Sequence, residues 1–369
     1  MAASPRLLPH AAMLIAAVAL AACAGGSPTT VKPPVDTTHT TVDTVPLRVY
    51  GDARGRWIGA ATGSVLTMPG DSGNTLRSIL GREFSMLWSG TYLKFDYLRP
   101  SRTTYNYASA DAVHAFAQSH AMVMRGHTLV WYQQIPSWLI NGGYGPDTVK
   151  AILKDHIDQV MGHYRGKMAA WDVVNEAMGD DGNLRTATSF WWQNVGPDYI
   201  AQAFRWAHAA DSTAVLYYND YATETINAKS TAVLSLLSDL KGRGVPIDGI
   251  GFQFHYAADQ APSTADIAAN FARFAALGLK IQITEADMRV RTLNGVPLNS
   301  ADLQTQATAY HNMVDACLQT PACNAIEIEG IYDGQAWVND PTQWGAPVLY
   351  DSHMQPKPAY YAVKAALKP

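Results

Sequence analysis

The sequence predicts an α/β protein of the (β/α)8 TIM-barrel class, on three observations. Short apolar runs typical of buried strands alternate with helical segments along most of the chain. Two of these runs end in polar pairs, Asn175-Glu176 and Thr284-Glu285, and the carboxyl ends of barrel strands are where such folds place their chemistry. The chain has 369 residues, 48% of them hydrophobic, which is enough for one large domain of this kind.

Eight strands, with six helices between them, are expected from about residue 47. The expected strands are 57–61, 84–88, 122–131, 169–175, 215–218, 247–255, 279–285 and 325–329. The expected helices are 109–119, 147–164, 198–210, 223–242, 265–277 and 301–319. Within 198–210, residues Ile200, Ala203, Phe204 and Ala207 share one face. Eight strands in this order favour a closed barrel over an open sheet.

Several other classes are excluded by missing signatures. No glycine-rich phosphate loop follows the first strand, and no Gly-x-Ser-x-Gly elbow is present. No His/Cys group has the spacing of a structural zinc site. The net charge of -4 and the isoelectric point near 6.2 argue against a nucleic-acid partner.

The N-terminus has the pattern of an export signal. Residues 1–22 contain a basic Arg6 and an apolar run, 11–22, shorter than the roughly 20 residues that span a bilayer. Leu20-Ala21-Ala22-Cys23 resembles a bacterial lipoprotein box, in which Cys23 becomes the lipidated first residue. Ordinary cleavage near Ala22 is the alternative. We expect an exported bacterial protein, lipid-anchored in the cell envelope and touching the membrane only through that anchor.

Three segments therefore divide the chain: a signal peptide (1–22), a Thr/Pro-rich flexible tether (23–46) and a catalytic domain (47–369). The other two cysteines, Cys317 and Cys323, are six positions apart. A local disulfide is the expected reading in an exported protein, and two buried free thiols are the alternative.

Most predicted strands end in polar or aromatic side chains. Alternation along the sixth strand would place Gln253 and His255 on one face. Glu176 and Glu285 end strands four and seven, roughly opposite each other in a closed barrel. Two carboxylates flanking a cleft, one protonated and one ionised, are the minimum equipment for glycoside hydrolysis. The alternative is that they merely pair with basic neighbours such as Arg289 or Arg125.

These motifs resemble the signatures of glycoside hydrolase family 10, the retaining endo-β-1,4-xylanases. The resemblance rests on Trp171-Asp172-Val173-Val174-Asn175-Glu176-Ala177, Ile283-Thr284-Glu285-Ala286-Asp287, Gly126-His127-Thr128-Leu129-Val130-Trp131 with Pro136-Ser137-Trp138, Tyr217-Tyr218-Asn219-Asp220-Tyr221, Ile247-Asp248-Gly249-Ile250-Gly251-Phe252-Gln253 with His255, and Pro356-Lys357-Pro358-Ala359-Tyr360. It covers the chain from about residue 57 to 368.

The resemblance implies a role for each matching residue. Glu176 matches the acid/base and Glu285 the nucleophile. Asn175 matches the residue that holds the sugar 2-hydroxyl. His255 matches the histidine that hydrogen-bonds the nucleophile, with Asp287 behind it and Gln253 beside it. The remaining implied substrate-binding residues are Lys94, His127, Trp131, Tyr132, Tyr218, Glu329 and Trp337. The implied chemistry is retaining double displacement with carboxylates about 5–5.5 Å apart, and it needs no cofactor or metal.

Four residues, at three places in the chain, depart from the family pattern. Gly90 and Thr91 stand where a Glu-Asn pair is expected before Lys94, a pair that binds the sugar one step beyond the cleavage site. Losing it removes charged hydrogen bonds worth about 1.5–3 kcal/mol each. Tyr132 replaces a histidine, and Glu329 replaces a tryptophan that walls the reacting sugar, whereas Trp337 is retained.

Glu329 has two interpretations. It either points into a wider, wetter pocket or recognises a hydroxyl or cation on a different sugar. A third carboxylate would also raise the pKa of Glu176 or Glu285. The departures are either neutral drift or altered substrate choice. The sequence thus predicts hydrolysis of β-1,4-xylosidic bonds in xylan or xylo-oligosaccharides. Two alternatives stay open: a β-glycosidase with shifted specificity, or a non-catalytic carbohydrate-binding lipoprotein.

Overall fold

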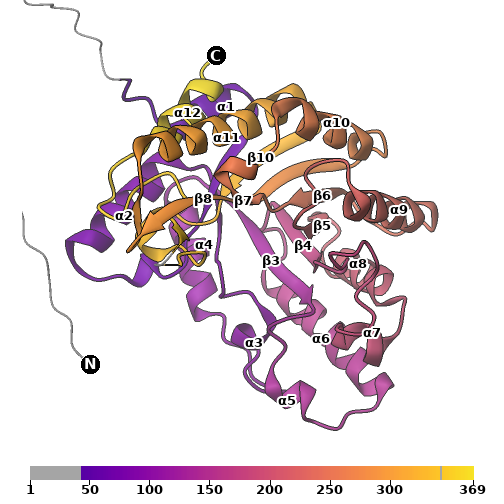
Figure 1. The fold of residues 1–369 in the computed structure, drawn as a ribbon. Coiled ribbons are helices and arrows are strands. Elements are labelled where there is room, and N and C mark those ends of the chain that lie inside the picture. The colour runs from indigo at the N-terminus through magenta and orange to yellow at the C-terminus, as the bar shows by residue number, and fades with distance from the viewer. Residues whose placement is uncertain (1–42, 341–342) are drawn as a thin grey trace, which may run out of the picture. The chain divides into compact units, whose positions relative to one another are not determined.

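A closed parallel barrel forms the centre of the computed structural model, which describes residues 43–340 and 343–369. The strands pair in the order β10-β1-β2-β3-β4-β5-β6-β8, and β10 also pairs with β8, so the sheet closes. All eight of these pairings are parallel. Figure 1 shows the helices on the outside of the strands, and the fold is the predicted (β/α)8 TIM barrel. Val45–Pro369 form one compact unit.

The barrel strands are β1 (Trp57–Ala61), β2 (Met86–Trp88), β3 (Val123–Trp131), β4 (Ala170–Asn175), β5 (Val215–Asp220), β6 (Gly249–Phe252), β8 (Lys280–Leu293) and β10 (Cys323–Ile328). Three short strands, β7 (His255–Ala257), β9 (Val296–Pro297) and β11 (Trp344–Gly345), pair with β8 beyond the barrel. The predicted strands are all present, but β8 continues to Leu293 because these three strands pair with its second half.

The α-helices are α1 (Leu47–Ala53), α2 (Gly70–Glu83), α3 (Phe95–Leu98), α4 (Ala108–Ser119), α5 (Ser137–Ile140), α6 (Pro146–His163), α7 (Phe190–Val195), α8 (Tyr199–Ala210), α9 (Ala228–Gly242), α10 (Thr264–Ala275), α11 (Ser300–Gln319) and α12 (Pro358–Leu367). Short 3-10 turns occur at η1 (Val65–Thr67), η2 (Ala258–Gln260) and η3 (Asp333–Gln335). The predicted apolar face of α8 is buried.

Two parts of the prediction are corrected. Helix α9 starts at Ala228 and not at residue 223, because Asn227 accepts a hydrogen bond from the Ser230 amide and caps it. Helices α1, α2, α3, α5, α7 and α12 were not predicted. The first turns of α2 read Gly-Asp-Ser-Gly-Asn, a poor helix former, and the helix is held by its buried Leu76, Ile79 and Leu80.

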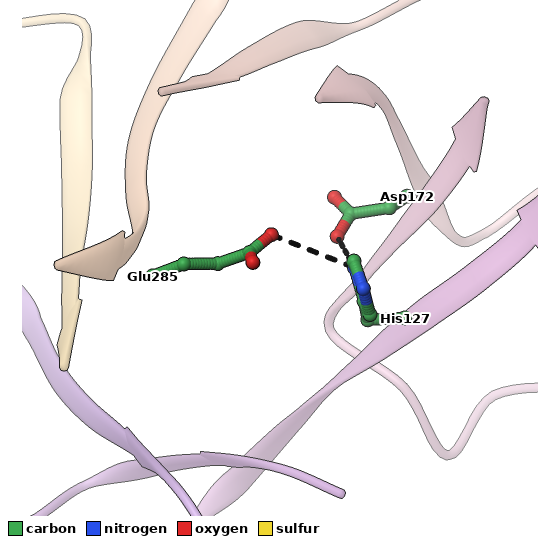
Figure 2. A group of neighbouring side chains, drawn as sticks. All are labelled: His127, Asp172 and Glu285. Carbon is green, nitrogen blue, oxygen red and sulfur yellow. Dashed lines mark hydrogen bonds and ion pairs between the residues drawn. The ribbon is translucent and has the colours of Figure 1, made fainter. Parts of the chain in front are cut away.

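A charged cluster lies inside the barrel. Arg125 on β3 is fully buried and ion-paired with Asp172 on β4 and with Glu327 on β10, 2.8 Å from its Nε. Asp172 also bonds His127 (Figure 2). Burial raises the pKa of Glu327 to about 8, against the opposing charge of Arg125. The Arg125 guanidinium thus links β3 with β4 and β10.

Arg125→Met is expected to destabilise the fold by about 3–5 kcal/mol, because it leaves Asp172 and Glu327 buried without their cation. Denaturant unfolding followed by circular dichroism measures this. The matched control is Arg243→Met, which breaks a solvent-exposed pair with Asp198 and should change the unfolding free energy little. Equal effects of the two variants would contradict the prediction.

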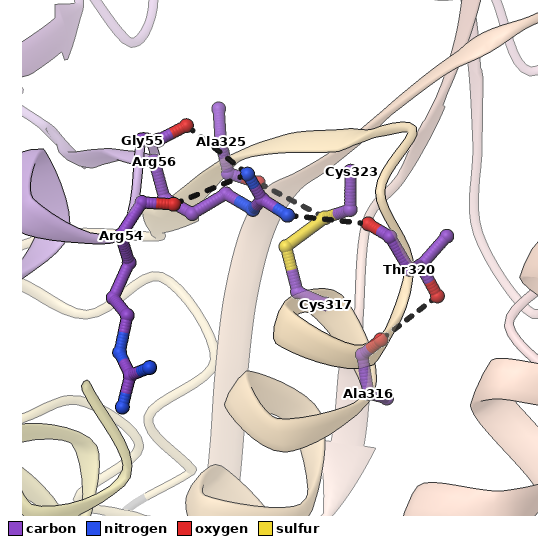
Figure 3. The surroundings of a disulfide bond; sticks show 8 residues. All are labelled: Arg54, Gly55, Arg56, Ala316, Cys317, Thr320, Cys323 and Ala325. Carbon is purple, nitrogen blue, oxygen red and sulfur yellow. Dashed lines mark hydrogen bonds between the residues drawn. A yellow bond between two sulfur atoms is a disulfide. The ribbon is translucent and has the colours of Figure 1, made fainter. Parts of the chain in front are cut away.

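A disulfide joins Cys317 and Cys323, as predicted, with the sulfurs bonded and the Cα atoms 5.3 Å apart. It connects the last turn of α11 to the first residue of β10 (Figure 3). Arg56 donates to the carbonyl of Thr320, which lies between the two cysteines. The expected signal peptide, Cys23 and nearly all of the expected tether lie outside the described residues. Among the helices that are described, none is long and apolar enough to cross a membrane.

Candidate active site

A cleft of about 460 Å³ opens at the carboxyl ends of the barrel strands. Its lining consists of Trp88, Gly90, Thr91, Lys94, Trp131, Tyr132, Gln133, Glu176, Tyr221, Gln253, His255, Glu285, Glu329 and Trp337. Both glutamates singled out from the sequence therefore face one cavity. Aromatic rings provide much of the rest of its wall, and flat rings of this kind cover sugar faces.

Glu176 follows the last residue of β4 in a left-handed backbone conformation, with φ of 55°. Such a conformation costs of order 1–3 kcal/mol in a residue other than glycine. Its amide donates to the Asn219 carbonyl at 2.8 Å, and its carbonyl accepts from Arg185 Nε at 3.0 Å. The side chain accepts from Trp131 Nε1 at 3.0 Å and from Gln253 Nε2 at 3.0 Å. The carboxyl group is thus aimed by donors from the last residue of β3 and from the residue that follows β6.

Glu285 lies within β8 and is surrounded by groups that favour its ionised form. Asn219 Nδ2 donates to Oε1 at 2.7 Å, and His255 Nε2 lies 3.5 Å from Oε2. Burial alone would raise its pKa, but His127, His255 and Arg125 outweigh burial and hold the pKa well below its ordinary value. Among the described residues, its close ion-pair partners are the two histidines. Arg125 instead pairs with Asp172 and Glu327.

Two asparagines connect the glutamates. Asn219 Nδ2 contacts both Glu285 Oε1 and Asn175 Oδ1, the latter at 2.8 Å, and Asn175 Nδ2 donates to Glu176 Oε1 at 3.2 Å. Gly251 on β6 makes room for Asn219, since a Cβ there would lie 2.3 Å from Asn219 Oδ1. The sequence placed Asn219 at the end of its strand but assigned it no role. Its contacts with Glu285 and Asn175 join different strands, so they could not be predicted from the local sequence.

His127 on β3 lies between Asp172 and Glu285 (Figure 2). Its Nδ1 is 2.8 Å from Asp172 Oδ2 and 3.8 Å from Glu285 Oε1, and its peptide bond to Thr128 is cis. These three side chains are close enough to hold a metal ion. However, the same Asp172 oxygen already accepts from the Arg125 guanidinium, and that fixed positive charge would repel a divalent cation. The group is better suited to orient Glu285.

His255 stands behind Glu285 as the sequence predicted, although the reasoning from strand alternation was wrong. Strand β6 ends at Phe252, and Phe254 turns the chain with φ of 62°. Gln253 and His255 nevertheless both line the cleft. His255 Nδ1 bonds Asp287 Oδ2 at 2.8 Å, and the same oxygen accepts from Trp337 Nε1 at 3.0 Å. Asp287 therefore raises the pKa of His255 well above its ordinary value, against the effect of burial.

At one side of the cleft Lys94 lies over the Trp131 ring, 4.8 Å from its centroid. At another, Arg185 stacks on Tyr132 at 4.3 Å and donates to the Tyr221 hydroxyl at 2.8 Å. Trp88, Gln133 and Tyr221 also line the cleft. Neither these three residues nor Arg185 were given a role from the sequence, although Tyr221 ends the motif Tyr217-Tyr218-Asn219-Asp220-Tyr221.

Four predicted binding residues do not line the cleft: Asn175, His127, Asp287 and Tyr218. The first three lie directly behind Glu176 and Glu285 and contact them or their partners. Tyr218 is different. Its hydroxyl donates to Asp220 at 2.5 Å and accepts from the Met178 amide at 3.2 Å. Tyr218 therefore supports the loop after β4.

Glu329 follows β10 and is half-buried at the edge of the cleft. Burial raises its pKa well above the ordinary value, and the charge of Glu285 raises it further. The pKa of Glu285 is lowered overall despite this neighbouring carboxylate, because His127, His255 and Arg125 outweigh burial there. Glu329, in contrast, has a raised pKa and holds its proton more tightly than an exposed glutamate does.

Residues 47–366 match the family model of glycosyl hydrolase family 10. The chain is 38% identical over 328 residues to endo-1,4-beta-xylanase B of Thermotoga neapolitana, which covers 88% of this chain and 92% of that protein. It is also 38% identical over 307 residues to endo-1,4-beta-xylanase A of Fusarium oxysporum f. sp. lycopersici, covering 81% of this chain and 92% of that one.

Solved structures agree with these relatives. Native xylanase 10B of Thermotoga maritima superposes with a TM-score of 0.82 at 38% identity, covering 88% of this chain and 98% of that chain. Xylanase 10B of Thermotoga petrophila RKU-1 in complex with xylobiose gives a TM-score of 0.83 at 37% identity, covering 88% and 97%. On the barrel, the cleft with its two glutamates, and a family match across nearly the whole described domain, the chain belongs to glycosyl hydrolase family 10.

Proposed function

We propose that this protein hydrolyses β-1,4-xylosidic bonds in xylan or xylo-oligosaccharides by retaining double displacement. The observation that carries the proposal is the pair of glutamates facing one cleft in different surroundings. Glu285 is held ionised by His127, His255 and Arg125, as a nucleophile must be. Glu176 contacts only neutral donors, Trp131, Gln253 and Asn175, among its described side-chain partners. Those donors aim the carboxyl that exchanges a proton with the leaving group.

In the first step a Glu285 oxygen attacks the anomeric carbon while the glycosidic bond breaks, and Glu176 gives its proton to the departing oxygen. In the second step Glu176 takes a proton from water, which attacks the same carbon and releases Glu285. Two attacks from opposite faces restore the starting configuration. In this mechanism Asn175 bonds the sugar 2-hydroxyl, and its contacts with Asn219 and Gln253 support that role.

Incubation with xylan and xylo-oligosaccharides tests the function. We expect reducing ends to be released, with the β-anomer appearing first in proton NMR before mutarotation. First release of the α-anomer would contradict the retaining mechanism. No turnover of these substrates or of aryl β-glycosides, together with measurable oligosaccharide binding, would favour the non-catalytic carbohydrate-binding protein instead.

Asn219→Ala is expected to lower kcat by about 10–100-fold, because Glu285 loses a hydrogen bond worth about 1.5–3 kcal/mol to a charged group and Asn175 loses its support. Steady-state kinetics on a xylo-oligosaccharide measure the change. Asn270→Ala is the matched control, since Asn270 is an equally buried asparagine that donates to the Thr223 carbonyl away from the cleft. A similar loss of kcat in both variants would show that Asn219 acts only through stability.

We further propose that residues 1–22 are a signal peptide, that Cys23 is lipidated, that 23–46 form a tether and that 47–369 form the catalytic domain. The support is the Leu20-Ala21-Ala22-Cys23 pattern and the Thr/Pro-rich segment after it. Expressed with its native N-terminus in a bacterium, the protein should partition into detergent, and Cys23→Ser should release it. Equal partitioning of both forms would contradict the anchor.

A further inference from the structure

A side pocket of about 70 Å³ adjoins the cleft between the ends of β10 and β1. Ala61, Thr62, Gly63, Val65, Glu329, Gly330, Ile331, Gln335 and Trp337 line it. Glu329 and Trp337 line both cavities, so the two share a wall. The volume suits a small substituent of a sugar, since a water molecule occupies about 30 Å³ of liquid.

Two glycines lie close together where the side pocket and the cleft adjoin. Gly63 lines the side pocket and Gly90 lines the cleft. A Cβ at Gly90 would lie 3.5 Å from the Cα of Gly63, so the two backbones face each other without side chains between them. The φ of 65° at Gly90 also favours glycine there.

One polar group in this side pocket is left for a ligand. Among the described residues, Oε2 of Glu329 is buried without a hydrogen-bond partner. The neighbouring polar side chains are already engaged: Gln335 donates to Ser64 Oγ at 2.8 Å, and Thr62 Oγ1 donates to the Trp88 carbonyl. A buried carboxyl oxygen without a partner is unfavourable, because it has lost its hydrogen bonds to water without replacing them. A ligand hydroxyl at this position would supply the missing hydrogen bond.

Topology indicates which part of the sugar reaches Glu329. In the closed barrel, β4 and β10 are separated by three strands in either direction, so they stand on opposite sides. Asn175 ends β4 and Glu329 follows β10. In a six-membered sugar ring, C2 and C5 are likewise opposite. If Asn175 holds the 2-hydroxyl, as under the proposed function, the C5 edge of the reacting sugar faces Glu329.

We propose that the side pocket accepts a neutral hydroxymethyl group on C5 of the reacting sugar, with Glu329 as its hydrogen-bond partner. The enzyme then cleaves β-glucosyl as well as β-xylosyl bonds, since the two sugars differ only in that group. The inference rests on the proposed hydrolytic function. An acidic substituent fits less well, because Glu329 is the one titratable side chain among the residues lining the side pocket, all of which the structure describes. Burial and Glu285 raise the pKa of Glu329, so its carboxyl can donate as well as accept.

The test compares 2,4-dinitrophenyl β-glucoside with 2,4-dinitrophenyl β-xyloside, which differ by the hydroxymethyl group alone. For the wild-type protein we expect kcat/KM for the glucoside to lie within about tenfold of the value for the xyloside. Glu329→Trp should fill the pocket and lower the glucoside-to-xyloside ratio at least about 100-fold. Glu329→Ala should lower it about tenfold by removing the hydrogen bond, and Glu329→Gln, which keeps a donor and an acceptor, by less than about threefold.

Asp71→Asn, an exposed charge change in the first turn of α2, is the control and should leave the ratio unchanged. Thermal unfolding of each variant confirms that it folds. A wild-type ratio below about 1:10, or an unchanged ratio in the alanine and tryptophan variants, would overturn this inference. Turnover of xylan and of the xyloside, with no turnover of the glucoside, would overturn this inference and leave the proposed function standing. No turnover of xylan or either glycoside overturns the proposed function as well.

Discussion

Glu285→Ala is expected to lower kcat on xylo-oligosaccharides by roughly 10⁴–10⁶-fold, the range for removing a catalytic nucleophile. The physical reason is that no other described carboxylate replaces it. Glu176 serves the leaving group, and Asp287 is committed to His255 and Trp337. Steady-state kinetics measure the loss, and circular dichroism confirms the fold.

Added azide sharpens this test. In Glu285→Ala the small anion can enter the space of the missing carboxylate and attack an activated aryl glycoside once, so the glycosyl azide should have the inverted configuration. A residual rate within about tenfold of wild type, or a retained azide product, would show that Glu285 is not the nucleophile.

Glu176→Ala is expected to lower kcat on xylo-oligosaccharides by about 10²–10⁴-fold, the contribution of general acid catalysis. The first step should be far less affected with 2,4-dinitrophenyl glycosides, because their leaving group needs no proton. The glycosyl-enzyme should then accumulate, since no base activates water, and mass spectrometry would detect it on Glu285. Burst kinetics with the dinitrophenyl substrate measure the two steps separately.

Azide again provides the control, with the opposite stereochemistry. In Glu176→Ala it should attack the glycosyl-enzyme and yield the retained azide, because two displacements have occurred. An equal loss of rate on xylo-oligosaccharides and on the dinitrophenyl glycoside would contradict the acid/base assignment. Opposite products from the two alanine variants would assign both glutamates in one pair of experiments.

The sequence by itself determined the barrel and both glutamates. Buried parallel strands are short continuous apolar runs, so each can be recognised from its own residues. The polar pairs that end two of them, Asn175-Glu176 and Thr284-Glu285, are equally local signals. The disulfide was also predictable, because Cys317 and Cys323 are only six positions apart.

The tertiary structure decided whatever depends on distant segments meeting. Asn219 contacts Glu285 only because β5 lies beside β4 and β6, and Gly251 leaves it room. Tyr218 belongs to the same motif as Asn219, but its hydroxyl accepts a hydrogen bond from the Met178 amide and so supports the loop after β4. Helix α2 begins with poor helix formers and is stabilised by burial of its apolar face, which local propensity does not reveal.

Glu329 shows the same division. Sequence comparison identified it as a carboxylate where an indole was expected. Only the folded barrel put its unpaired oxygen at a side pocket formed by β1 and β10, segments more than 200 positions apart in the sequence. Burial and neighbouring charge set its proton affinity, and both arise from packing between strands. Local sequence therefore located the chemistry, and the closure of the barrel arranged the groups that select the sugar.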